Sequence, residues 1–115
     1  MKFLVTKDAC LVLAAAYEKY LSRRKSGEDR TNAVQFMFQS DLTGNAISRM
    51  SPYDVSAAIT ELGRNKLLRV YGVGFNLTDL GIAVIEQRLL KDQKDIHSWI
   101  DTILSAALGA IPLIL

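Results

Sequence analysis

The sequence predicts a small α+β domain that is mainly helical and carries one short β-hairpin. Three stretches of its 115 residues carry this prediction. Residues 51–65 have the pattern of a capped amphipathic helix, residues 67–77 that of a tight hairpin, and residues 6–27 that of a long first helix. The length suits a single domain, which we place at residues 1–91, with residues 92–115 as an apolar appendage.

The helix over residues 51–65 has the best-marked start in the chain. Ser51 suits the N-cap, Pro52 suits the first helical position because its missing N–H would have no partner there, and Asp54 completes a Ser-x-x-Asp box. Asn65 accepts the left-handed conformation that ends many helices. The apolar residues of one face recur at helical spacing: Val55, Ala58, Ile59 and Leu62.

The hairpin follows directly. Residues 67–71 are apolar and partly β-branched, Gly72 and Gly74 flank a turn, and residues 75–77 return as the second strand. Thr78 and Asp79 then start another helix, which the apolar spacing carries to about Lys91.

The helix, the hairpin and the phrase Leu77-Thr78-Asp79-Leu80-Gly81 together resemble the second half of a winged helix-turn-helix domain, similar to the MarR and PadR-like regulators. The resemblance covers the middle third of the chain closely and the first half loosely. It implies a three-helix core, with the helix from Ser51 in the DNA major groove and the hairpin as the wing. It also implies that the protein is a transcriptional regulator that binds double-stranded DNA.

The first half is less regular. Thr6 and Asp8 suit the start of the first helix, while residues 1–5 fit either an edge strand or an extended arm. Residues 31–50 alternate like a strand in part and follow helical spacing in part. We favour a short helix capped by Thr31 or Asn32 and ending before Gly44, as the second helix of the core.

Charge is distributed unevenly. Residues 1–71 hold eleven basic and seven acidic side chains, and the rest of the chain holds three basic and five acidic ones, which sum to the totals of 14 and 12 and a net charge of +2. A basic half favours a nucleic-acid partner.

The single cysteine and single histidine exclude an internal disulfide and the usual zinc clusters. No Ser/His/Asp, Cys/His or paired-carboxylate arrangement can be assembled, so we expect no enzyme and no cofactor. The first residues lack the apolar core of a secretory signal, which predicts a cytoplasmic protein.

The candidate DNA contacts lie on and after the helix from Ser51. Small and hydrogen-bonding side chains would let this helix approach base edges, and arginine would reach a guanine or a phosphate. The candidates are Tyr53, Ser56, Ala57, Thr60, Arg64, Lys66 and Arg69. An ordinary solvated face is the alternative, because Asp54 and Glu61 offset two of the cations. The predicted wing has only Arg69 at its base and Val73 at its tip, which counts against DNA binding.

A second basic cluster ends the first helix. Arg23, Arg24, Lys25 and Arg30 are candidate phosphate contacts. A solvated helix end, favoured by the helix dipole, explains three of them equally well.

The last residues form an apolar tail. From Thr102 onward no charge appears for fourteen residues, fewer than the roughly 20 that span a bilayer. We expect a helix that holds two copies together as a homodimer, with packing on its own domain or membrane contact as alternatives. Its dimerisation face would comprise Trp99, Ile100, Ile103, Leu104, Ala107, Leu108 and Ile111. A protein-interaction module assembled or tethered by this tail, without DNA binding, is the alternative function.

Overall fold

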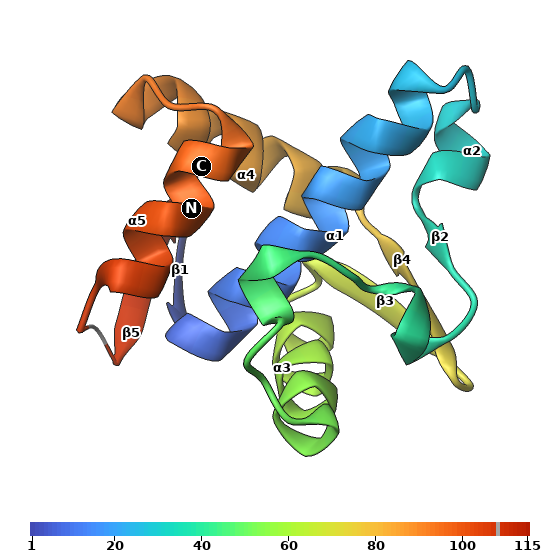
Figure 1. Ribbon diagram of the computed structural model, residues 1–115, viewed down its shortest axis with the longest axis horizontal. Coiled ribbons are helices and arrows are strands. Elements are labelled where there is room, and N and C mark those ends of the chain that lie inside the picture. Colours follow the sequence, from blue (N-terminus) through green and yellow to red (C-terminus); the bar gives the residue numbers. More distant parts are fainter. Residues whose placement is uncertain (108) are drawn as a thin grey trace.

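A long helix, α1 (Lys7–Lys25), runs through the middle of the molecule, and the other elements pack around it (Figure 1). The computed structural model describes residues 1–107 and 109–115. Every residue of α1 from Ala9 to Tyr17 is buried, so this part of the helix is covered on all sides. A helix that is apolar all round is typical of a core element rather than of a surface helix.

The local signals predicted three helix starts correctly. The side chain of Thr6 accepts from the backbone N–H of Ala9 at the start of α1, and Ser51 accepts from Asp54 at the start of α3 (Pro52–Arg64). The side chain of Thr78 caps α4 (Asp79–Asp92) in the same way. Each cap satisfies a backbone N–H that has no partner inside its helix.

The predicted hairpin is confirmed and belongs to a three-stranded sheet. Strands β3 (Leu68–Tyr71) and β4 (Gly74–Leu77) pair antiparallel, and β2 (Gln35–Phe36) pairs with the other side of β4, giving the order β2-β4-β3. On the inner face Phe36 stacks on Phe75 with ring centroids 4.8 Å apart. The mainly helical α+β class is therefore correct.

Helix α4 passes very close to this sheet. A Cβ built on Gly81 would lie 2.3 Å from the carbonyl oxygen of Leu67, closer than any side chain can approach. Glycine at this position lets the first turn of α4 sit against the start of the hairpin.

The predicted helix between Thr31 and Gly44 is wrong. Helix α2 (Arg30–Ala33) is a single turn capped by Asp29, and β2 and two 3₁₀ turns, η1 (Gln39–Asp41) and η2 (Asn45–Ile47), follow it. The Asp41 carboxylate accepts from the backbone N–H groups of Met37 and Phe38 at 2.9 and 3.1 Å. Backbone donors held by a side chain in this way are lost to a helix.

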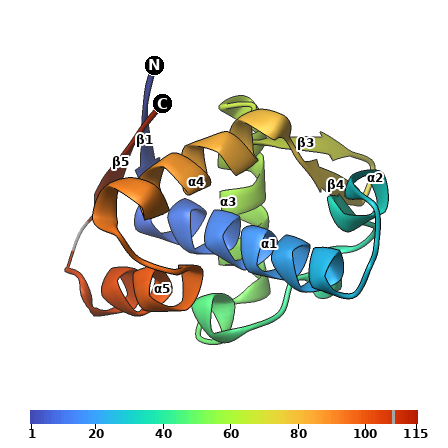
Figure 2. The ribbon, with the colours of Figure 1, turned by 90° about the horizontal axis from the view of Figure 1, so that it is seen from above.

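The predicted tail helix is present only in its first half, and a strand replaces it beyond Ser105. Helix α5 (Ile96–Ser105) is followed by β5 (Ala110–Ile114), which pairs antiparallel with β1 (Lys2–Thr6). This pairing shows that the first residues form a strand, and it brings the N and C ends side by side (Figure 2). The ammonium of Lys7 donates to the carbonyl of Ala106 at 2.6 Å and so caps the end of α5. Residues 92–115 are therefore integrated into the fold.

The predicted dimerisation face is not a free surface. Four of its members are buried in the chain's own core, with exposed fractions of 4% or less: Trp99, Ile100, Ile103 and Ile111. Leu104 is half-buried, Ala107 is exposed, and Leu108 lies outside the described residues. The expected face is thus corrected to packing on the chain's own domain, and dimerisation itself stays a prediction. None of the described helices is both long and apolar enough to cross a membrane.

Candidate nucleic-acid interface

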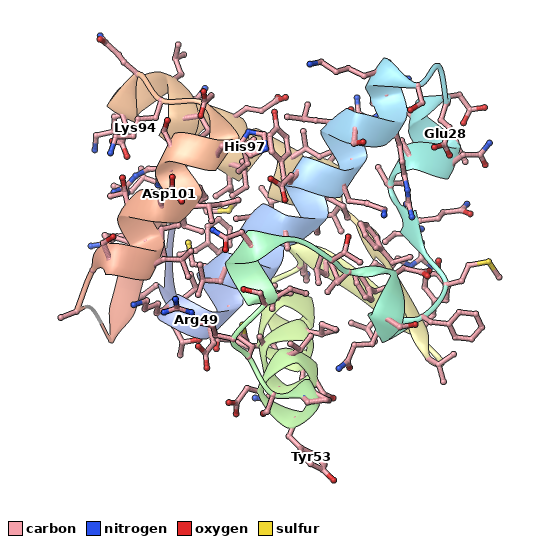
Figure 3. All side chains as sticks on the ribbon, viewed as in Figure 1. Glu28, Arg49, Tyr53, Lys94, His97 and Asp101 are labelled. Atoms are coloured by element: carbon pink, nitrogen blue, oxygen red, sulfur yellow. The ribbon has the colours of Figure 1, made fainter. Side chains whose placement is uncertain are left out.

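The outer face of α3 is exposed along its whole length. Its buried residues are those predicted from the spacing, Val55, Ala58, Ile59 and Leu62. The opposite side carries Tyr53, Ser56, Ala57, Thr60 and Arg64, all exposed. Tyr53 is 88% exposed, and Figure 3 shows it pointing away from the start of the helix. Arg64 makes no hydrogen bond or ion pair to the described residues.

Two further candidate cations lie differently. Lys66 is exposed just after α3, in the left-handed conformation with φ 61°, and its carbonyl accepts from the Thr78 hydroxyl at 2.7 Å. Arg69 pairs in register with Asn76, whereas the neighbouring Val70 lies against α3, 3.0 Å from a Cβ built on Gly63. Because side chains alternate across a strand, Arg69 points to the face of the hairpin away from α3. It does not join the α3 surface.

A groove of about 410 Å³ separates α3 from the hairpin. It is lined by Phe38, Gln39, Ser56, Ile59, Thr60, Val70, Gly72, Val73, Gly74 and Phe75. None of these residues is charged, and Phe38 and Val73 are 55% and 76% exposed. The Gln39 amide donates to the carbonyl of Pro52 at 2.9 Å, which ties η1 to the start of α3.

Phe38 and Gln39 were not among the predicted site residues. The alternating pattern around Phe36 was the only sequence signal for them, and it competes with a helical pattern over the same residues.

Three of the four residues of the expected phosphate cluster have partners within the fold, and phosphate contact by this cluster stays a prediction. Arg23 donates to the carbonyls of Ala33 and Gln35, and its guanidinium carbon lies 4.8 Å from the Phe36 ring centroid. Arg24 donates to a backbone carbonyl at 3.2 Å, and Arg30 forms an ion pair with Asp79 at 2.7 Å. Lys25 makes no such contact with the described residues.

A second groove, of about 1200 Å³, lies between α1 and the start of α5. Within it the Nε2 of His97 is 2.9 Å from an oxygen of Glu18, an ion pair when the imidazole is protonated. No group of three potential metal ligands occurs among the described residues. Cys10 is fully buried, and burial raises the pKa of its thiol to about 12, so the inert thiol dominates at neutral pH. Within the part of the chain that the structure describes, these side chains form no assembled catalytic group.

The sequence matches no family model, and neither a curated protein nor a solved structure matches it. Function must therefore be inferred from the surface of the molecule itself.

Proposed function

We propose that the chain is a winged-helix protein that binds double-stranded DNA and regulates transcription, with α3 as the helix that enters the major groove. The observation that carries this proposal is the exposed, uninterrupted outer face of α3 beside the β3–β4 hairpin. The strand order β2-β4-β3, in which β2 comes from the chain between α1 and α3, supports the same arrangement.

The dimensions of α3 suit a groove. Its 13 residues make a rod about 20 Å long, which fits into the roughly 12 Å-wide major groove of B-DNA. Ser56 and Ala57 are small enough for close approach, and Thr60 and Arg64 offer hydrogen bonds to base edges. Lys66 follows at the end of the helix, where it would reach a phosphate.

Fluorescence anisotropy with labelled duplexes of mixed sequence, at about 50 mM salt, tests the proposal. Arg64→Ala should weaken binding by about 1 to 3 kcal/mol, and Thr60→Ala should change the preference among sequences. Lys94→Ala is the matched control, since Figure 3 places Lys94 at the other end of the molecule from Tyr53. Folded wild-type protein that binds no duplex, or Arg64→Ala that binds as well as wild type, would overturn the assignment of α3 as the reading helix.

A protein-interaction module without DNA binding is the second candidate function. The uncharged groove between α3 and the hairpin favours it, because DNA interfaces are strongly positive whereas protein interfaces centre on apolar and aromatic side chains. Assembly through the tail is no longer part of this candidate, since Trp99 and its neighbours are buried. On this reading Phe38→Ala would abolish partner binding and no duplex would bind.

A further inference from the structure

We infer that the outer face of α3 pairs with the same face of a second copy of the chain, with the two helices antiparallel. The surface concerned is a stripe of four exposed residues, Tyr53, Ala57, Thr60 and Arg64, here called the α3 stripe. Steps of four, three and four residues keep these side chains on one side of a helix, which is the spacing that pairs helices.

The α3 stripe matches itself under two-fold symmetry. An axis that passes midway between Ala57 and Thr60 also passes midway between Tyr53 and Arg64. Two antiparallel copies therefore place Tyr53 opposite Arg64 of the second copy and Ala57 opposite Thr60 of the second copy. Each contact occurs twice, as in any two-fold interface.

The paired groups complement each other chemically. Tyr53 is 88% exposed as a whole residue, and Arg64 has no ion-pair partner among the described residues. An arginine over an aromatic face forms a favourable cation–π contact. The small side chain of Ala57 at the centre lets the helices approach closely. Since Asp54 lies near the start of α3 and Lys66 follows its end, antiparallel packing also brings opposite charges and opposite ends of the helix dipoles together.

Apolar side chains beside the α3 stripe enlarge the contact. Phe38 and Val73 line the groove that Thr60 also lines, so they flank the stripe on the hairpin side. Both are more than half exposed, and a second copy would cover them.

Self-pairing does not depend on DNA binding, but it uses the same helix face. If α3 also enters the major groove, a second copy and a duplex compete for it. The outer face of α3 would then be covered in the dimer and exposed in the monomer. The concentration of the protein would therefore regulate how much of it can bind a duplex.

Sedimentation velocity from about 5 to about 500 µM, the affinity range of small interfaces, tests the inference. Wild type should pass from monomer to dimer in this range. Tyr53→Lys sets a lysine opposite Arg64 of the second copy and should raise the dissociation constant about tenfold or more. Combining Tyr53→Lys with Arg64→Glu should restore the dimer, because opposite charges then face each other. Circular dichroism verifies that these exposed substitutions leave the fold intact.

A duplex-binding assay on the same variants separates the two proposals. Tyr53→Lys adds a cation to the face proposed to enter the groove, so it should tighten duplex binding while it weakens self-association. A wild type that stays monomeric throughout, a Tyr53→Lys dimer as tight as wild type, or a double variant that is not restored would overturn the α3 pairing. Absence of duplex binding with intact self-association would overturn only the DNA proposal.

Discussion

Arg23 is a surface cation by sequence and a core-supporting residue by structure. Its guanidinium covers the Phe36 ring and donates to two backbone carbonyls, which joins the end of α1 to the start of β2. Hydrogen bonds from a charged donor and a cation–π contact stabilise more than an exposed ion pair does. Arg23 therefore supports the position of the whole β2 segment.

Arg23→Ala should lower the free energy of unfolding by about 1 to 3 kcal/mol. Lys25→Ala, two residues away on the same helix, should change it by less than about 0.5 kcal/mol because Lys25 is exposed. Urea denaturation followed by circular dichroism measures both. Equal effects of the two variants would show that the Arg23 contacts contribute nothing to stability.

Cys10 predicts a pH dependence of stability. Burial raises the pKa of its thiol from an ordinary value of 9.0 to about 12, against a smaller opposing effect of Arg88. Because the unfolded chain ionises first, the stabilisation is complete below about pH 9 and is lost as the pH rises toward 12.

Between about pH 8 and about pH 10, wild type should therefore lose about 1 kcal/mol more stability than Cys10→Ala does. Urea denaturation at the two pH values measures the change in the free energy of unfolding for each protein. Because each protein is compared only with itself at the other pH, the stability that Cys10→Ala loses through its smaller side chain cancels. In native protein the thiol should also resist alkylation. Rapid modification without denaturant would contradict the burial of Cys10.

At the scale of elements, strand β5 contributes to the hydrophobic core and is not an appendage to it. In β5, Ile111 and Leu113 face inward and are buried, while Ile114 is half exposed. The partner strand β1 shows the same alternation around buried Val5. A two-stranded ribbon is marginal in water unless one face packs on other elements, and this ribbon packs on α1, α3 and α4.

Leu113→Ala should destabilise the protein by about 2 to 5 kcal/mol, because it leaves a cavity in a fully buried position. Ile114→Ala removes a similar apolar group from the neighbouring position, which faces outward, and should cost less than about 1 kcal/mol. Thermal and urea unfolding of the two variants measure this difference in stability. If the two variants were equally stable, β5 would not be held against the core as the structure shows.

At the scale of the whole molecule, the charges that remain free limit how DNA can be bound. Arg23, Arg24 and Arg30 have partners in the fold, and Arg69 points away from α3. Among the described residues, the unpartnered cations near this helix are Arg64 and Lys66 at its end and exposed Arg49 just before its start. Few phosphates can be neutralised at one time by such a surface.

A plot of log affinity against log salt should therefore be shallow. Each phosphate contact contributes a slope of about −0.9, so two to four contacts predict a slope of about −2 to −4. Anisotropy titrations across a range of salt concentrations measure it, with Lys66→Ala expected to reduce the slope by about 1. A slope steeper than about −6 would require a basic surface other than α3.

Short-range signals made much of this molecule predictable. These signals involve only residues that are close together in the sequence. They are the caps at Thr6, Ser51 and Thr78, the turn between Gly72 and Gly74, and the apolar spacing of α3. They indicated α1, α3, the hairpin and α4, and with them the exposed face of α3. They also indicated which residues of α3 are buried.

The sequence by itself determined the elements whose hydrogen bonds close locally, because a helix or a tight hairpin satisfies its backbone within neighbouring residues. Only the tertiary structure decided residues 31–50 and 110–114. Phe36 is held in β2 by Phe75, and β5 is held by β1 at the other end of the chain. A strand takes its hydrogen bonds from a distant partner, so an apolar run such as residues 110–114 fits a helix equally well until that partner is in place.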